Sequence, residues 1–407
     1  MDKKQQNRKG RRRMSFEPQI PLQIESKHEI SKLKSLKVIS ADYKDNLILN
    51  TAFMKEYPDY PEVKISPKCL GQVKSYAYNS YRGINKPKNE DRVVVINQIP
   101  KPTKTMHKIW PKMHFFGIFD GHGGDNISEF LKKNFLSYLN ENKNFPYDIK
   151  LALSETFEKI EADIYEQNKG KTLKEIDRSG SCALVAVLTE SKIYIANIGD
   201  SRAIMSLNYG SKIKQLTVDH KPNNITEYER IIKNGGKVYV DDDYLEDLNG
   251  KYDANKLKYI LKKTDFDKYK GDKEAIFRHY PSNLAIARSI GDLKAKKKEY
   301  GGIPGNIIGI PDIYVLDYST SNDFMIMGCD GIFDYLSNEE LAQSAWYIIK
   351  KNMKDKNYSI NLLTRDSCDM IIKYSMDSLA TDNLTCIVIG LDGLQKYINL
   401  KKIKEKK

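Results

Sequence analysis

The chain has 407 residues, of which 40% are hydrophobic and 10% aromatic, a composition typical of folded globular proteins and unlike that of disordered ones. Its net charge of +13 is concentrated at the ends, because residues 1–13 carry seven Lys or Arg against one Asp and residues 401–407 carry five Lys against one Glu. The other 387 residues carry only +3, so the body of the chain lacks the basic stripe of a nucleic-acid-binding protein.

The sequence shows no sign of secretion or of membrane insertion. No run approaches the ~18 consecutive apolar residues of a membrane span, and no apolar segment follows the basic residues 1–13 as it would in a secretory signal. The five cysteines are scattered and odd in number, which favours buried free thiols in a reducing compartment. We therefore expect a monomeric cytoplasmic protein, with the nucleus as the alternative. The basic cluster at 1–13 leaves four interpretations open: a nuclear address, a peripheral tether to an anionic membrane, a docking arm or a solubilising tail.

Composition divides the chain into four parts. Residues 1–20 are polar and basic and are predicted to be disordered, and residues 21–72 are predicted to form an N-terminal extension. Residues 73–395 form the main domain, and 396–407 a basic C-terminal tail. Within the domain, residues 237–283 begin with acidic residues and continue with lysines, so we expect them to be an insertion on the surface.

Strand-like and helix-like patterns occur in blocks along the main domain. Short runs rich in Val, Ile and Phe predict strands at 93–96, 115–119, 182–188, 193–198, 203–207, 324–327 and 386–391. Apolar residues at three- and four-residue spacing predict helices at 127–139, 149–165 and 362–379. The capping boxes Thr226-x-x-Glu229 and Ser337-x-x-Glu340 predict the starts of two more helices. This order favours the α+β class: a four-layer αββα sandwich, with two central antiparallel sheets flanked by helices.

Carboxylates stand beside several of these apolar runs. Three of them follow the runs 115–119, 324–327 and the one around Leu379, and two precede the run 93–96; they are Asp120, Asp330, Asp382, Glu90 and Asp91. A carboxylate at the end of a buried strand is costly unless a charged group meets it, which suggests a shared metal. Oxygen ligands without a His or Cys cluster favour Mg²⁺ or Mn²⁺ over zinc. Five carboxylates exceed what one such ion needs and suit a two-metal centre.

Eight short motifs together resemble the type 2C metal-dependent Ser/Thr protein phosphatases. They fall in that family's order between about residues 73 and 391, and they are Asn89-Glu90-Asp91, Phe119-Asp120-Gly121-His122-Gly123-Gly124, Asp177-Arg178-Ser179-Gly180-Ser181, Asn197-Ile198-Gly199-Asp200-Ser201-Arg202, Asp219-His220-Lys221-Pro222, Ala287-Arg288-Ser289-Ile290-Gly291-Asp292, Cys329-Asp330-Gly331-Ile332-Phe333-Asp334 and Thr381-Asp382-Asn383. The resemblance implies hydrolysis of phosphoserine or phosphothreonine on proteins, by direct attack of a water that bridges two Mg²⁺ or Mn²⁺ ions.

The resemblance also implies a role for each site residue. Asp120 would bridge the two ions and the Gly121 carbonyl would ligate one of them, with Glu90 on the same side. Asp330 and Asp382 would hold the other ion. Asp91 would orient the waters on the ions, and Asp177 would help a third, weaker ion to bind beside Asp330. His122 would be the general acid for the leaving oxygen.

One position departs from the family pattern. Many members have an arginine four residues before the glutamate, where it clamps the substrate phosphate, but this chain has Lys86. An ammonium group cannot form the two parallel hydrogen bonds of a guanidinium, so we expect weaker or differently oriented phosphate binding. Arg82 is the alternative clamp.

Two interpretations compete with an active phosphatase. A silent pseudophosphatase would bind phosphoproteins as a regulatory scaffold, but it would be expected to have lost metal carboxylates, and this chain keeps them. Nucleic-acid binding would depend on the charged ends alone. Four further aspartates, Asp200, Asp219, Asp292 and Asp334, are interpreted as turn formers and loop anchors and not as site residues.

Overall fold

A computed structural model describes residues 55–67, 71–103, 109–240, 276–355 and 357–404. All of them belong to one unit, Ser40–Lys407. The predicted tail 1–20, most of the extension 21–72 and most of the segment 237–283 lie outside the described residues.

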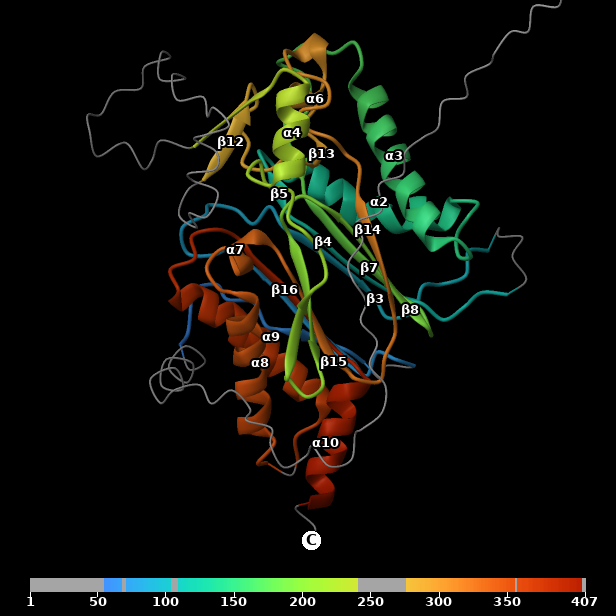
Figure 1. The fold of residues 1–407 in the computed structure, drawn as a ribbon, viewed down its shortest axis with the longest axis vertical. Coiled ribbons are helices and arrows are strands. Elements are labelled where there is room, and N and C mark those ends of the chain that lie inside the picture. Colours follow the sequence, from blue (N-terminus) through green and yellow to red (C-terminus); the bar gives the residue numbers. More distant parts are fainter. Residues whose placement is uncertain (1–54, 68–70, 104–108, 241–275, 356, 405–407) are drawn as a thin grey trace, which may run out of the picture. The chain divides into compact units, whose positions relative to one another are not determined.

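Two antiparallel sheets form the centre of this unit (Figure 1). The six-stranded sheet has the order β1 (Lys64–Ile65), β2 (Ser75–Tyr81), β16 (Leu384–Gly390), β15 (Asn322–Gly328), β9 (Arg202–Leu207) and β10 (Lys212–Gln215). The five-stranded sheet has the order β14 (Asp312–Asp317), β8 (Lys192–Ile198), β7 (Ala183–Leu188), β4 (His114–Phe119) and β3 (Arg92–Ile96). Every strand run predicted above is confirmed within two residues at either end.

Helices cover the outer face of each sheet (Figure 1). The five-stranded sheet contacts α2 (Asn126–Glu141) and α3 (Ile149–Asn168). The six-stranded sheet contacts α9 (Ile360–Asp377) and α10 (Asp392–Lys404), and α8 (Asn338–Asn352) packs against α9. The predicted α+β class with antiparallel central sheets is therefore confirmed.

The alternation of side chains along β4 separates two cores. Phe116 and Ile118 point into the core between the sheets, whereas Phe115 and Phe119 point into the core beneath α2 and α3. Successive residues of a strand face opposite sides, so one continuous apolar run can serve both cores. That is why the strand run is apolar throughout.

Helix starts show one correct and one wrong prediction. At α8 the Ser337 side chain accepts from the backbone N–H of Glu340, and the Glu340 side chain accepts from the Ser337 N–H, as predicted. At α4 (Ile225–Lys233) the cap is Asn224, whose side chain accepts from the N–H of Thr226, so the predicted box at Thr226 is wrong. Asparagine caps as well as threonine does, and it precedes the apolar pattern more closely.

The apolar run before Asp382, unlike the runs before Asp120 and Asp330, is not predicted to be a strand, and the structure has no strand there. Leu379 is 79% exposed and adopts φ +67 just after α9 ends. Asp382 consequently lies in the connection that leads into β16, before the strand and not after it. The remaining described strands are short: β5 (Gly121–His122), β6 (Gly180–Ser181) and β13 (Ile290–Gly291) form one small sheet, and β11 (Lys237–Val240) pairs with β12 (Phe277–Tyr280).

Three short helical turns complete the described elements: α6 (Leu293–Lys296), η5 (Lys298–Tyr300) and α7 (Asp330–Phe333). Among the described helices, none combines the length and the apolar character needed to cross a membrane.

Candidate active site

A cavity of about 600 Å³ lies at the ends of the two central sheets. Asp120 enters it directly after β4, and Asp330 enters it from the first residue of α7, just after β15. Its polar wall consists of Lys86, Glu90, Asp120, Gly121, His122, Cys182, Asp200, Lys221, Asn223, Asp330, Gly331, Asp334, Tyr335, Thr381 and Asp382. Its other wall consists of Ile276, Phe277, Arg278, Leu284, Ala285 and Ile286, which flank or belong to β12.

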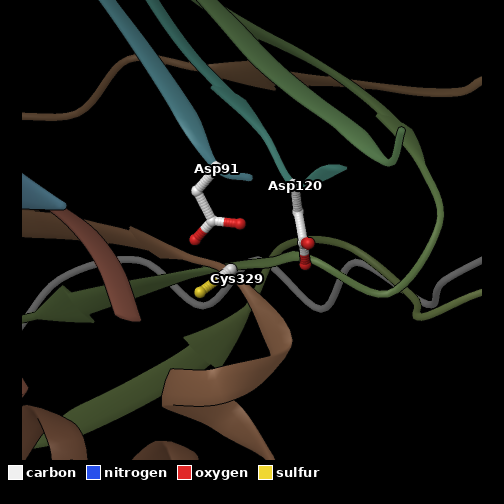
Figure 2. A group of neighbouring side chains, drawn as sticks. All are labelled: Asp91, Asp120 and Cys329. Carbon is white, nitrogen blue, oxygen red and sulfur yellow. The ribbon is translucent and has the colours of Figure 1, made fainter. Parts of the chain in front are cut away.

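Asp120 is the centre of the carboxylate cluster. One possible ligand atom from each of Asp91, Asp120 and Cys329 lies within 4.8 Å of the other two, and the side chains converge from different loops (Figure 2). The same holds for Asp120, Cys182 and Asp200. Asp120 therefore stands between two groups of metal-ligating side chains.

Close packing of backbone holds the loops of the site together. A Cβ on Gly121 would lie 2.6 Å from the Glu90 carbonyl oxygen and 2.7 Å from Ser128 Oγ, so only glycine allows the two loops to come this close. Asn383 joins a third loop to them, because its Oδ1 accepts from the Glu90 N–H at 2.8 Å and its Nδ2 donates to the Lys88 carbonyl at 3.1 Å. These contacts bring residues almost 300 positions apart to one edge of the cavity.

Burial and mutual repulsion make the cluster costly when it is fully ionised. Burial, together with the nearby charge of Asp330, raises the pKa of Asp120 well above its usual range. Burial and the charge of Asp200 do the same to the pKa of Asp330. Burial raises the pKa of Asp91 to about 6. A divalent cation would relieve this repulsion, so the cluster fits such an ion.

Asp91 supplies a second indication of a missing partner. Its side chain is buried, its Oδ2 accepts from Thr385 Oγ1 at 2.6 Å, and its Oδ1 has no hydrogen-bond partner among the described residues. A buried carboxylate oxygen normally has such a partner. The two thiols nearby are poor candidates for ligation, because burial raises the pKa of Cys182 and of Cys329 well above the usual range. The donor set is therefore one of oxygen atoms, which suits Mg²⁺ or Mn²⁺.

Two lysines bring positive charge into the cavity. Lys86 Nζ lies 2.7 Å from Asp382 Oδ1, and the side chains of both are about 40% exposed. Lys221 Nζ lies 2.6 Å from Asp334 Oδ1 and 3.8 Å from Asp200 Oδ2. The alternative clamp, Arg82, does not line the cavity; its Nη1 donates to the Lys86 carbonyl at 2.5 Å.

His122 is held by a buried carboxylate. Its Nε2 lies 2.7 Å from Asp292 Oδ2, and the two side chains are 27% and 6% exposed. Burial alone would lower the pKa of His122, but the charge of Asp292 and this hydrogen bond raise it. The imidazole thus borders the cavity with one nitrogen committed to a carboxylate.

The structure brings most of the predicted site residues together. Seven of them line the cavity, namely Lys86, Glu90, Asp120, Gly121, His122, Asp330 and Asp382, and Asp91 lies in the cluster behind Asp120. Asp177 is not among the lining residues; its Oδ1 accepts from the N–H and Oγ of Ser179 at 2.9 and 2.8 Å.

Three aspartates that were interpreted as loop anchors belong to the site or touch it. Asp200 and Asp334 line the cavity, and Asp292 binds His122. Asp200 stands two residues after strand β8, so the strand-end pattern that identified Asp120 would also have found Asp200. Only Asp219 fits its interpretation, because it forms a two-bond ion pair with Arg202 at 3.0 and 2.6 Å.

Solved structures with the same fold include known phosphatases. The serine-threonine phosphatase 2C from Toxoplasma gondii aligns with a TM-score of 0.56 at 21% identity, covering 81% of this chain and 99% of that one. A sex-determining protein of C. elegans aligns with a TM-score of 0.58 at 19% identity, covering 82% and 68%. Identities this low support the fold.

Sequence relatives identify the family. "Probable protein phosphatase 2C 4" of Paramecium tetraurelia is 29% identical over 295 residues, which cover 69% of this chain and 83% of the relative. "Probable protein phosphatase 2C 27" of Arabidopsis thaliana is 30% identical over 277 residues, which cover 68% and 58%. The sequence model of the family described as protein phosphatase 2C matches residues 85–384. The chain therefore belongs to the protein phosphatase 2C family.

Proposed function

We propose that this protein hydrolyses phosphoserine and phosphothreonine on protein substrates in a reaction that depends on two Mg²⁺ or Mn²⁺ ions. The observation that carries the proposal is the partly buried carboxylate cluster around Asp120. Its members raise one another's pKa, and one oxygen of Asp91 lacks a partner among the described residues. A set of oxygen donors that repel one another in the absence of a cation is suited to binding one.

The carboxylates would divide between the two ions. Asp120 would contact both ions, because it belongs to both groups of neighbouring possible ligand atoms. The Gly121 carbonyl and Glu90 would lie on one side, and Asp330 and Asp382 on the other. Asp91, held by Thr385, would orient the water around the ions. Asp177, hydrogen-bonded to Ser179, would contribute only to a third, weaker site.

The ions when bound would activate a water and neutralise charge on the phosphoryl oxygens. The chain's own side chains would do the rest. Lys86, at the rim of the cavity, would orient the substrate phosphate through its ammonium group. His122 would give a proton to the serine or threonine oxygen as that oxygen leaves phosphorus. No cysteine or serine nucleophile is required, in agreement with the raised pKa of Cys182.

The test is release of phosphate from a phosphothreonine peptide with and without Mn²⁺. We expect release only with Mn²⁺ or Mg²⁺, with complete loss in EDTA. Asp120→Ala should lower the rate of phosphate release by more than about a hundredfold, since ion binding supplies several kcal/mol to such reactions. Asp317→Ala is the matched control, because it removes an 86% exposed carboxylate at the end of β14 that pairs only with Lys192 among the described residues.

Two outcomes would contradict the proposal. Full activity in metal-free buffer, or in Asp120→Ala, would exclude the two-metal reaction. Wild-type protein that binds Mn²⁺ in calorimetry but releases no phosphate would instead be a silent phosphoprotein-binding scaffold.

A further inference from the structure

His122 forms a hydrogen bond with Asp292, a residue 170 positions away. The bond joins His122 Nε2 to Asp292 Oδ2 at 2.7 Å, and the carboxylate is almost fully buried. Among the described residues, Nδ1 of the ring has no hydrogen-bond partner. A histidine whose one nitrogen is fixed by a carboxylate presents the other nitrogen to the site.

Asp292 is itself held in place. It adopts a left-handed conformation, with φ 50 and ψ 41, at the start of α6. Ser289 Oγ donates to Asp292 Oδ2 at 2.6 Å, and the Asp292 N–H donates to the Ser179 carbonyl at 3.1 Å. A non-glycine residue in this conformation is uncommon and is retained where its surroundings fix it. The carboxylate therefore has one orientation, toward His122.

The small sheet β5–β6–β13 creates the space for this contact. Gly180 on β6 pairs with His122 on β5 and with Gly291 on β13, so His122 and Asp292 reach each other across the middle strand. A Cβ on Gly180 would overlap with both Asp292 Oδ2 and His122 Nε2. The absence of a side chain at residue 180 thus permits the bond.

A second set of contacts fixes the Asp292 loop from helix α3. Glu161 Oε1 accepts from the Gly291 N–H at 2.7 Å, and its Oε2 accepts from Lys296 Nζ at 2.6 Å. Lys296 Nζ also donates to the Ser289 carbonyl at 2.7 Å and is only 7% exposed. Such supporting contacts keep a reacting group in a productive orientation.

We infer that Asp292 is a positioning residue: through its contact across Gly180 it keeps the proton of His122 on Nε2 and directs Nδ1 into the cavity. This inference rests on the proposed function. During the reaction the attacking water forms a P–O bond, and the bond from phosphorus to the serine or threonine oxygen breaks. That oxygen keeps the electron pair and takes a proton from Nδ1. One water proton stays on the product phosphate and the other restores His122.

The test compares two leaving groups. A phosphothreonine peptide releases an alkoxide-like oxygen that needs a proton, whereas p-nitrophenyl phosphate releases a phenolate that needs it far less. Asp292→Asn should therefore lower kcat for the peptide at least tenfold more than kcat for p-nitrophenyl phosphate, with KM little changed. His122→Gln should show the same selectivity. The double variant should be no slower on the peptide than His122→Gln alone.

Gly180→Ala provides an independent variant that keeps both side chains and separates them. It should lower kcat for the phosphothreonine peptide as Asp292→Asn does. Ser289→Ala should lower the same kcat by a smaller factor. Asp317→Asn, at the exposed end of β14, is the control and should leave kcat unchanged for both substrates. Thermal unfolding and Mn²⁺ calorimetry identify any variant that fails to fold.

The outcomes separate the two proposals. If folded Asp292→Asn loses the same factor on both substrates, or if its effect multiplies with that of His122→Gln, Asp292 is only structural and the inference fails. If the wild-type protein itself releases no phosphate from the peptide with Mn²⁺, the proposed function fails and this inference fails with it.

Discussion

At residue 86 a lysine stands where many family members have an arginine. Lys86 Nζ is 2.7 Å from Asp382 Oδ1, so its ammonium already serves one carboxylate at the rim. Lys86→Arg would supply a planar group that can bind phosphate through two hydrogen bonds. The added contact could stabilise the bound phosphate by on the order of 1–2 kcal/mol. We therefore expect kcat/KM for a phosphopeptide to rise roughly five- to thirtyfold. Steady-state kinetics at fixed Mn²⁺ measure it.

A neighbouring lysine provides the matched control. Lys88 Nζ lies 2.5 Å from Asp125 Oδ1 and does not line the cavity, so Lys88→Arg should leave kcat/KM unchanged. Lys86→Ala should lower kcat/KM if the lysine contacts phosphate. Unchanged kinetics in Lys86→Ala would show that the position is not a clamp in this protein.

The residues of the site were predictable to the extent that each carried a local signal. Asp120 and Asp330 come after apolar strands of six and seven residues, so the sequence places them at sheet ends. The contact of His122 with Asp292 had no such signal, because it depends on β5, β6 and β13, each two residues long. Periodicity is not detectable over two residues. Asp292 therefore looks like a loop anchor until the chain is folded.

At the scale of elements, the hairpin β11–β12 connects the cavity wall to the segment predicted as an insertion. Val240 pairs directly with Phe277, so the described residues on either side of 241–275 lie close together. Ile276 and Phe277 line the cavity. Because paired positions are about 5 Å apart, a short turn can join them. The described ends of the predicted insertion thus lie beside the site.

This geometry allows a sharp test of the segment that lies outside the described residues. Replacing 241–275 with a four-residue Gly/Ser turn should leave kcat for p-nitrophenyl phosphate within about twofold, since this substrate is small and the metal-binding carboxylates are elsewhere. Discrimination among phosphopeptides should change, and its salt dependence should weaken if the segment's charges steer encounter. The measurement is a panel of peptides at two salt concentrations.

Two results would oppose the assignment. Collapse of p-nitrophenyl phosphate turnover with Mn²⁺ still bound would place the segment in the catalytic core. No change in either assay would show a passive insertion. Ile276→Asp complements the deletion, because it alters the described wall alone and should lower the rate for peptides with an apolar residue next to the phosphothreonine.

At the scale of the whole molecule, the fold was predictable because strands and helices have strong repeating patterns. Alternate apolar residues of β4 pack into the two cores. The spacing of apolar residues by three and four positions in α3 predicts the buried face of that helix. The order of strands in each sheet was not predictable, since β16 pairs with β2 across some 300 residues. Such pairing depends on the packing of the two sheets and not on local sequence.

The stacking of the two sheets brings carboxylates together at a cost in stability. Asp120 comes from the five-stranded sheet and Asp330 from the six-stranded one, and burial together with the charge of Asp330 raises the pKa of Asp120. In EDTA, Asp120→Asn should remove this repulsion and stabilise the protein by about 1–3 kcal/mol, or a few degrees in Tm. With excess Mn²⁺ the wild-type protein should be more stable than Asp120→Asn, because the ion stabilises only a chain that binds it.

Asp219→Asn is the control for the direction of the stability change that is expected of Asp120→Asn in EDTA. Asp219 is also largely buried, but its two oxygens accept from Arg202 Nε and Nη2. Removing its charge therefore deprives the guanidinium of this paired carboxylate. This variant should lower Tm equally in EDTA and in Mn²⁺. Thermal unfolding of the three proteins in both buffers is the measurement. Asp120→Asn that is less stable than wild type in EDTA would show that the cluster is satisfied without a cation, and the metal centre proposed around Asp120 would be wrong.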